Sequence, residues 1–214
     1  MIGLVENAPS PQWESPGSAT RAFARVGLDA IAVSPGVLER VADDLSSLTL
    51  VLRLNLPSAR QRLVSIQGAL EMGAEAVAVT IDATSPRDLE LLGRTAEDAR
   101  RWGMPLIAEM FGEDFREISS LAAEFGADVI QLAATASDVA QLRAAVKTAR
   151  RPVLVRISGG EGEGLIRSLN SLLETGIEGI VVEPLPERSL HAIHGLIHQG
   201  ASLEEALGVI VGSI

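Results

Sequence analysis

The sequence predicts an α/β fold, a single (β/α)8 (TIM) barrel with an extra C-terminal helix, from two observations. First, a glycine, a small or apolar residue and an acidic residue precede an apolar β-rich run four times, starting at Gly27, Gly73, Gly126 and Gly176. Second, a further apolar run precedes each of these copies. A strand, a helix and two loops take about 25 residues, so each interval of about 50 residues holds two βα units. The chain is therefore predicted to contain eight strands that alternate with helices.

The two sets of apolar runs supply all eight predicted strands. Apolar residues spaced three and four apart predict helices between them, and the capping box that starts at Ser202 predicts a ninth. An open doubly wound sheet would give the same local signals, but strict alternation through eight units favours a closed barrel. No linker interrupts residues 1–214, which form one predicted domain. The predicted strands lie at 2–7, 27–33, 50–55, 73–79, 105–110, 126–132, 152–158 and 176–182, and the predicted helices at roughly 18–26, 37–46, 58–72, 86–102, 114–125, 137–149, 163–175, 187–199 and from 202 onward.

The composition excludes several classes of function. The absence of cysteine excludes disulfides, thiolate metal sites and cysteine nucleophiles. A formal charge of −10 and the lack of a basic cluster disfavour nucleic acid as a partner. No apolar run approaches the roughly 20 residues that cross a bilayer, and the first residues carry no secretory signal pattern, so we expect a cytoplasmic protein without a membrane partner. The hydrophobic content of 47% favours a homo-oligomer.

The inward side chains near the carboxyl ends of the strands are expected to be polar. In barrels of this kind alternate strands supply layers of four inward side chains, and the chemistry lies at the carboxyl ends of the strands. Superposing the odd-numbered strands gives an apolar layer, then a charged layer, then a mixed layer. These layers contain Leu4, Val51, Ile107 and Leu154, then Glu6, Arg53, Glu109 and Arg156, and then Ala8, Asn55, Phe111 and Ser158.

Two interpretations of the charged layer remain open. Four charges buried together would be very costly unless they were paired, so a closed ring of salt bridges with bidentate arginine contacts could simply fill the barrel. Alternatively, Arg53 or Arg156 binds the carboxylate or phosphate of a small-molecule ligand while Glu6 or Glu109 acts as the catalytic acid or base. The two arginines disfavour a magnesium site, so we predict no metal and no cofactor.

Four stretches of the chain, at 69–79, 92–110, 122–130 and 196–207, resemble the archaeal-type class I fructose-bisphosphate aldolases and the related aminodideoxyheptulosonate synthases. The resemblance implies lyase chemistry through a Schiff-base lysine on the sixth strand. Gln131 occupies that position, and an amide nitrogen is not nucleophilic. The sequence holds a single lysine, Lys147, within the predicted helix before strand seven. The resemblance also places an acid–base tyrosine where this chain has Phe111, so we predict a diverged member that lacks the Schiff-base mechanism.

The resemblance further implies a phosphate site formed by the loops after strands seven and eight, where backbone amides receive the anion. The first loop is present as Ser158, Gly159 and Gly160. The second, a glycine–arginine pair in the family, is replaced by a segment that starts at Glu183. A carboxylate therefore lies near the place where a phosphate would bind.

The resulting hypothesis is a diverged aldolase-like lyase that binds a small oxygenated carboxylate or a sugar-phosphate-like ligand. A carboxylate, Glu6 or Glu109, would remove a proton next to a carbonyl while an arginine stabilises the oxyanion. The alternative is a non-catalytic pseudoenzyme that senses a ligand or assembles with a paralogue. The predicted substrate-binding residues are Arg53, Arg156, Asn55, Gln131, Ser158, Gly159 and Gly160.

Overall fold

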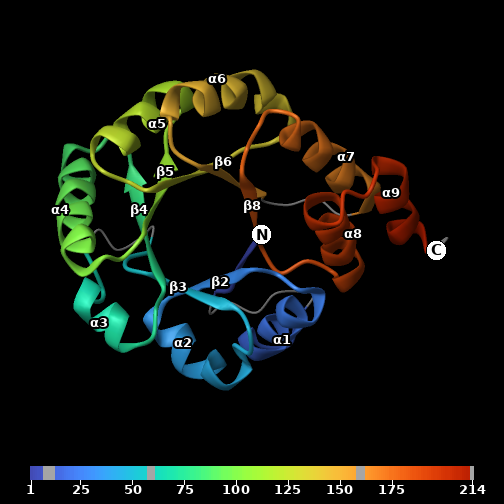
Figure 1. The fold of residues 1–214 in the computed structure, drawn as a ribbon, viewed down its shortest axis with the longest axis horizontal. Helices are drawn as coiled ribbons and strands as arrows, with labels where there is room; N and C mark the ends of the chain where they lie inside the picture. Colours follow the sequence, from blue (N-terminus) through green and yellow to red (C-terminus); the bar gives the residue numbers. More distant parts are fainter. Residues whose placement is uncertain (7–12, 57–60, 158–161, 213–214) are drawn as a thin grey trace.

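Eight parallel strands close into a barrel in the order in which they follow one another along the chain (Figure 1). The computed structural model describes residues 1–6, 13–56, 61–157 and 162–212. The predicted (β/α)8 barrel is confirmed, since β1 pairs with both β2 and β8. The strands are β1 (Ile2–Leu4), β2 (Ala30–Val33), β3 (Thr49–Arg53), β4 (Ala76–Asp82), β5 (Leu106–Phe111), β6 (Val129–Ala133), β7 (Val153–Ile157) and β8 (Gly179–Val182).

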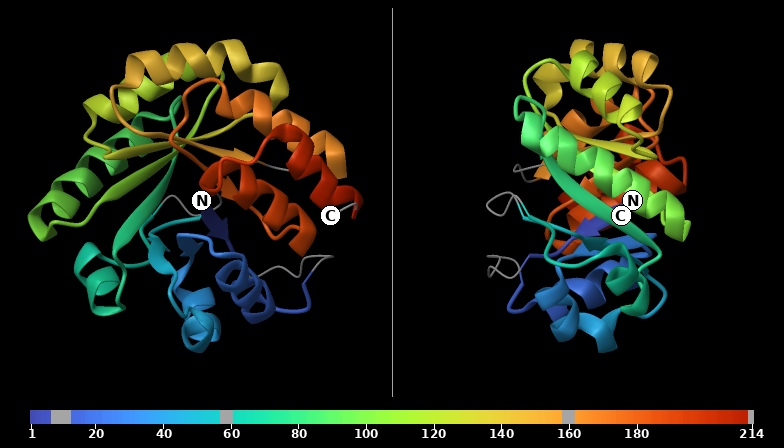
Figure 2. Two further views of the ribbon diagram at one scale, coloured as in Figure 1. Left: turned by 45° about the vertical axis from the view of Figure 1, so that its right-hand side comes forward. Right: turned by 90° about the vertical axis from the view of Figure 1, so that its left-hand side faces the viewer.

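The helices form a ring outside the strands, as Figure 1 shows in the view down the barrel. In Figure 2 the last helix lies beside α7 and α8, against which it packs. In the part of the chain that the structure describes, no helix is long and apolar enough to cross a membrane. The helices are α1 (Pro16–Val26), α2 (Pro35–Val41), α3 (Ile66–Glu71), α4 (Pro86–Trp102), α5 (Phe115–Glu124), α6 (Val139–Ala149), α7 (Gly162–Leu173), α8 (Glu187–His198) and α9 (Leu203–Val211), with 3-10 turns at Ala42–Asp44 and Ala136–Asp138.

The repeated glycine lies in the turn between a helix and each even-numbered strand. Gly27, Gly73, Gly126 and Gly176 all have φ between 84° and 96°, in the left-handed region that side chains with a Cβ rarely adopt. Each glycine therefore turns the chain from the end of a helix toward the next strand. This requirement explains why the repeat begins with the same residue four times.

In three of the four copies the repeated acidic residue contacts the start of the strand before it. Asp128 Oδ2 accepts a hydrogen bond of 3.0 Å from the backbone N–H of Leu106, and Glu178 Oε2 accepts one of 2.7 Å from that of Val153. These donors lie at the start of β5 and β7, where the ladder to the next strand has not yet begun. Asp29 receives the α-ammonium group of Met1 in the same way. The acidic residue of the repeat thus serves the fold at the amino end of the barrel.

Apolar side chains fill two separate regions. One lies between the strands and the helices, and the other lies inside the barrel. Neighbouring strands present the inner residues to one another in register, so that Leu4 pairs with Ala32 and Ala32 with Val51. The predicted inward register is confirmed on this point. The inner cluster contains Leu4, Ala30, Ala32, Val51, Ala78, Ile107 and Val181, with Leu154 packed against it.

One helix begins later than the sequence-based prediction placed it. The helix expected at 58–72 begins only at Ile66, where Ser65 Oγ accepts a hydrogen bond of 3.0 Å from the backbone N–H of Gly68. The preceding segment instead returns to β3, since the Leu63 N–H donates to the Leu54 carbonyl at 2.6 Å. By contrast, the capping box at Ser202 and Glu205 opens α9 as expected.

Candidate functional site

The polar side chains inside the barrel gather toward the carboxyl ends of the strands. They follow the apolar cluster along β3, β4, β5 and β6 and have the same inward parity. The innermost members are at most 7% exposed, so most of their hydrogen-bonding capacity has to be met inside the barrel. They are Arg53, Asn55, Thr80, Glu109 and Gln131.

Arg53 and Glu109 form a bidentate ion pair across the barrel. Arg53 Nε lies 3.1 Å from Glu109 Oε1, and Arg53 Nη2 lies 2.9 Å from Oε2. The hydroxyl of Thr80 donates a third hydrogen bond, of 2.7 Å, to Oε2. Burial disfavours the charge on Arg53, but the carboxylates of Glu109 and Glu6 outweigh it and raise the pKa of the guanidinium. The sequence-based expectation of a bidentate contact is confirmed for this pair.

Glu6 extends the same network toward the barrel mouth. Its Oε1 accepts a hydrogen bond of 3.2 Å from Arg53 Nη1, while half of its side chain, 51%, remains exposed. Arg53 thus uses one side of its guanidinium on Glu109 and the other on Glu6. The result is a solvent-accessible carboxylate oriented by a buried arginine.

Asn55 links the ends of β3 and β4. Its Oδ1 accepts the backbone N–H of Thr80 at 2.7 Å, and its Nδ2 donates to the Thr80 carbonyl at 2.9 Å. These two bonds use both polar atoms of the amide and fix the backbone that carries the Thr80 hydroxyl. In this structure Asn55 therefore holds the backbone of Thr80 in place.

Arg156 belongs to a second, separate pair. Its Nε and Nη2 donate to Glu183 Oε1 at 3.1 and 2.7 Å. The predicted ring of Glu6, Arg53, Glu109 and Arg156 is therefore not closed, because within the described residues no ion pair joins Arg156 to either glutamate of that set. Glu183 follows β8, which lies next to the strand β7 that carries Arg156, so Arg156 pairs with this neighbour. Glu109 is already bound by Arg53 and Thr80.

Gln131 faces the interior, and its side chain has no hydrogen-bond partner among the described residues. It lies in register with Glu109 on β5 and Leu154 on β7, and it shares its parity with Val129, which packs against the inner apolar cluster. The residue is 6% exposed. None of the described residues donates to or accepts from its amide.

Several other predicted features lie elsewhere. Lys147 is exposed on α6, outside the barrel, and Phe111 is 39% exposed at the end of β5. His198 lies 3.2 Å from Asp29, near the amino ends of the strands. The predicted ligand contacts at 158–160 lie outside the described residues.

Thr80 and Glu183 belong to the site although the sequence-based list of site residues omits them. Both follow even-numbered strands at inward positions, so the same parity that selected Arg53 and Arg156 was the signal available. What the sequence could not provide was the choice of partners. Parity predicts which residues face inward, and side-chain reach decides which of them pair.

A family model described as DeoC/LacD family aldolase matches residues 5–182 of this barrel. The chain belongs to the DeoC/LacD aldolase family. Among curated relatives, 2-amino-3,7-dideoxy-D-threo-hept-6-ulosonate synthase 1 from Archaeoglobus fulgidus is 23% identical over 207 residues, which cover 84% of this chain and 78% of that protein. The expected resemblance to class I aldolases is therefore confirmed at the level of the family.

Solved structures of aldolases share the fold of this DeoC/LacD family member. A Schiff-base-forming fructose-1,6-bisphosphate aldolase is 25% identical, with a TM-score of 0.72 over 92% of this chain and 94% of that chain. The fructose-bisphosphate aldolase from Slackia heliotrinireducens is 17% identical, with a TM-score of 0.81 over 100% of this chain and 86% of that chain. The second likeness concerns the fold alone.

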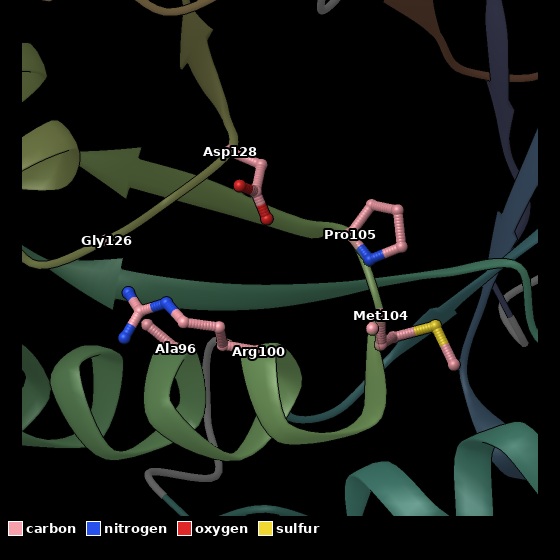
Figure 3. A pocket seen from close by; sticks show the side chains of 7 residues that line it. Ala96, Arg100, Met104, Pro105, Gly126 and Asp128 are labelled. Atoms are coloured by element: carbon pink, nitrogen blue, oxygen red, sulfur yellow. The ribbon is translucent and has the colours of Figure 1, made fainter.

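A pocket of about 400 Å³ lies at the opposite end of this aldolase-family barrel (Figure 3). It is open to solvent between α4 and the starts of β5 and β6. The guanidinium of Arg100 extends from α4, and the carboxylate of Asp128 accepts the hydrogen bond that holds the start of β5. In TIM-barrel enzymes the amino ends of the strands serve stability, so we assign this pocket no role in the reaction. Its lining residues are Ala96, Arg100, Gly103, Met104, Pro105, Gly126 and Asp128.

Proposed function

We propose that this aldolase-family protein binds a small oxygenated ligand, a carboxylate or a sugar-phosphate-like compound, at the carboxyl end of the barrel and acts on it without a Schiff base. One observation carries the proposal: the buried Arg53, held by Glu109, presents the half-exposed carboxylate of Glu6 to the barrel mouth. A pre-oriented carboxylate beside an open mouth is suited to proton transfer.

An imine pathway has no amine available in the described interior. Schiff-base catalysis needs the nucleophilic nitrogen of a lysine next to the substrate carbonyl. The sequence provides only Lys147, which is exposed on the outer surface of α6. Gln131 occupies the inward position on β6, and its amide lone pair is delocalised into the carbonyl. Any reaction at this site therefore proceeds without a covalent link through lysine.

Glu6 is the better base of the two predicted glutamates. A carboxylate offers about four acceptor positions, and Glu109 already uses three of them on Arg53 and Thr80. Within the described residues Glu6 accepts one hydrogen bond, from Arg53, and its side chain is half exposed at the mouth. Glu109 then acts as the buried counter-ion that positions Arg53.

The proposed step is removal of a proton from the carbon next to a ligand carbonyl. The proton passes to Glu6, and the electron pair of the C–H bond moves onto the carbonyl oxygen to give an enolate. Arg156 is the arginine suited to meet that oxygen, because its Nη1 has no hydrogen-bond partner in the described part of the chain. A guanidinium N–H aimed at developing negative charge lowers the barrier to its formation.

A second candidate is a non-catalytic barrel that binds the same class of ligand as a sensor or as part of an assembly with a paralogue. It is favoured by the internal pairing of the charged groups, since Arg53 is bound by two glutamates and Arg156 by Glu183. Charges that satisfy one another stabilise a fixed interior and need no substrate.

Calorimetric titration combined with borohydride reduction tests the proposal. The purified protein is titrated with dihydroxyacetone phosphate and with glycerate. The same mixtures are then treated with borohydride, and the mass of the protein is measured by mass spectrometry. We expect a saturable binding isotherm for at least one compound and no mass increase after reduction. Failure to bind either compound would contradict the binding proposal, whereas a reduced covalent adduct would contradict the non-imine chemistry.

A further inference from the structure

Three large apolar side chains, Leu70, Met72 and Trp102, are exposed where α3 and α4 end, and we call them the α3/α4 patch. Leu70 and Met72, at the end of α3, are 45% and 40% exposed, and Trp102, at the end of α4, is 44% exposed. The two helices lie side by side in the outer ring (Figure 1). Met72 and Trp102 each directly precede a turn glycine before β4 or β5, and these two strands pair in parallel. The patch therefore lies at the amino end of the barrel.

The position of Trp102 around α4 brings it to the side of α3. On the other side of α4, Arg100 Nη2 lies so close to the turn before β6 that a Cβ on Gly126 would be 3.1 Å from it. Trp102 follows Arg100 by two residues, which is about 200° around a helix. Asp98, four residues before Trp102 and so on its face of the helix, binds Arg62, just before α3, at 2.7 Å. Trp102 therefore shares the α3 side of α4.

The α3/α4 patch is a local gathering of apolar side chains. Helix α3 has six residues against seventeen in α4, so it leaves part of the neighbouring flank of α4 uncovered. The other large apolar residues that are exposed in the described chain belong elsewhere, with Leu63 and Phe111 near the carboxyl ends of the strands and Val211 on α9. Gathered exposed apolar groups with a polar rim mark contact surfaces, and tryptophan and methionine are enriched at protein interfaces.

The two sides of the patch carry charges of opposite sign. Glu71, on the α3 side, is exposed and accepts a hydrogen bond of 2.9 Å from Gln67, and it has no ion pair within the described residues. Arg101, on the α4 side, is 68% exposed, and its nearest carboxylate oxygen, on Glu97, is 3.9 Å away. Such a long, solvent-exposed contact contributes little. The α3 side is thus apolar and acidic, and the α4 side is aromatic and basic.

A surface of this kind is complementary to its own copy. In a twofold symmetric contact the α3 side of one copy meets the α4 side of the other, and the reverse contact forms at the same time. Met72 then packs against the indole of the partner's Trp102, a favourable contact between sulfur and an aromatic ring. Glu71 meets the partner's Arg101. Each favourable contact is made twice.

We propose that the α3/α4 patch, with the flanking charges of Glu71 and Arg101, is the contact surface of a symmetric dimer of this chain. A standard interface buries about 800 Å² on each partner, more than three partly exposed side chains supply, so the patch forms its apolar centre and polar neighbours form the rim. We therefore expect a weak dimer that forms reversibly at roughly 100 μM. The proposal is independent of the reaction proposed above, because the polar mouth lies at the other end of the barrel.

Sedimentation equilibrium of the purified chain over a range of concentrations tests the dimer. We expect a reversible equilibrium between monomer and dimer in the wild type. Trp102→Ser should weaken the association about tenfold or more, as loss of an aromatic anchor at the centre of an interface implies. Val211→Ser, which removes an apolar side chain that is 60% exposed on α9, is the control and should leave the association unchanged. Circular dichroism verifies that each variant is folded.

Charge reversal tests the pairing across the twofold axis. Glu71→Arg or Arg101→Glu alone should weaken the dimer, because each places two like charges opposite one another at two places in the interface. The double variant Glu71→Arg/Arg101→Glu exchanges the two charges and should recover association close to that of the wild type. Recovery of this kind requires contact between the two positions and does not follow from a general loss of stability.

Three results overturn the inference. A wild type that stays monomeric up to about 1 mM has no dimer of the proposed kind. Association that Trp102→Ser leaves unchanged, or that Val211→Ser weakens equally, shows that the copies meet through another surface. A double charge variant that associates no better than the single variants shows that Glu71 and Arg101 do not face each other across the axis.

Discussion

Arg53 Nη2 and Glu109 Oε2 lie 2.9 Å apart inside the barrel, where both side chains are almost completely buried. The pair joins β3 to β5 across the interior and makes the charged layer a fixed structure. Because buried charges lose their hydration, the value of the pair depends on the completeness of its hydrogen bonds. The hydroxyl of Thr80 and the carboxylate of Glu6 supply the remaining contacts.

Breaking this pair on one side should be more harmful than removing it altogether. Arg53→Met leaves Glu109 buried without an ion-pair partner, so it is expected to lower the free energy of unfolding by roughly 3–5 kcal/mol. Glu109→Gln leaves Arg53 with only the half-exposed Glu6 as a charged partner, so it is expected to lower the free energy of unfolding by a smaller amount. The double variant Arg53→Met/Glu109→Gln should be more stable than the sum of the single changes predicts. Urea denaturation in a double-mutant cycle measures this coupling, and additive losses would show that the two side chains do not depend on each other.

A buried threonine without a hydrogen bond offers a stabilising substitution. The Thr95 hydroxyl, on α4, is sealed from solvent and has no partner within the described chain, whereas the Thr20 hydroxyl, on α1, donates to the Pro16 carbonyl at 2.9 Å. Thr95→Val should therefore raise the free energy of unfolding by about 1 kcal/mol, since it removes an unpaired polar group at constant volume. The matched Thr20→Val should be neutral or destabilising, and equal effects of the two changes in thermal or urea unfolding would refute the explanation.

A lysine at the inward position of β6 should restore imine chemistry. In Gln131→Lys the amine would stand at a position where the native residue is only 6% exposed, and an amine in such a desolvated position is shifted toward its nucleophilic neutral form. Borohydride reduction with dihydroxyacetone phosphate should then give one covalent adduct on the variant and none on the wild type. A folded, ligand-binding variant that stays unlabelled would show that the barrel lacks the remaining geometry for an imine.

Stability should decrease on mild acidification through His194 on α8. Burial lowers its pKa from the ordinary value of 6.5, and repulsion from His198 adds to this effect, while Asp29 opposes it. A histidine with a depressed pKa stays neutral in the folded state while the unfolded chain takes up the proton, so its contribution is complete above pH 6.5 and is lost as the pH falls below it. Urea midpoints between pH 7.5 and 5.5 should fall less in His194→Gln than in the wild type, and parallel curves would contradict this assignment.

The sequence was sufficient for the fold and for the parity of the inward residues. The four glycines of the repeat each adopt a left-handed backbone conformation. This requirement concerns a single residue, so the sequence alone reveals it. The pairing of Arg156 with Glu183 instead of Glu109 was not predictable, because it depends on which side chain reaches which partner around a closed ring. The helix expected at 58–72 was also too long, since Leu63 returns to the backbone of Leu54, a contact between separate segments.

Exchange of the carbon-bound protons of dihydroxyacetone phosphate with deuterium oxide, followed by proton NMR, tests the central claim most directly. We predict that the wild type accelerates this exchange and that Glu6→Gln slows it by about 100-fold or more, as loss of a general base implies. Glu204→Gln, the same change at an exposed position on α9, should leave the rate unchanged. Exchange that is equally fast in the Glu6 variant would contradict the role of Glu6 as the base, and its absence in a wild type that binds the ligand would favour the non-catalytic barrel.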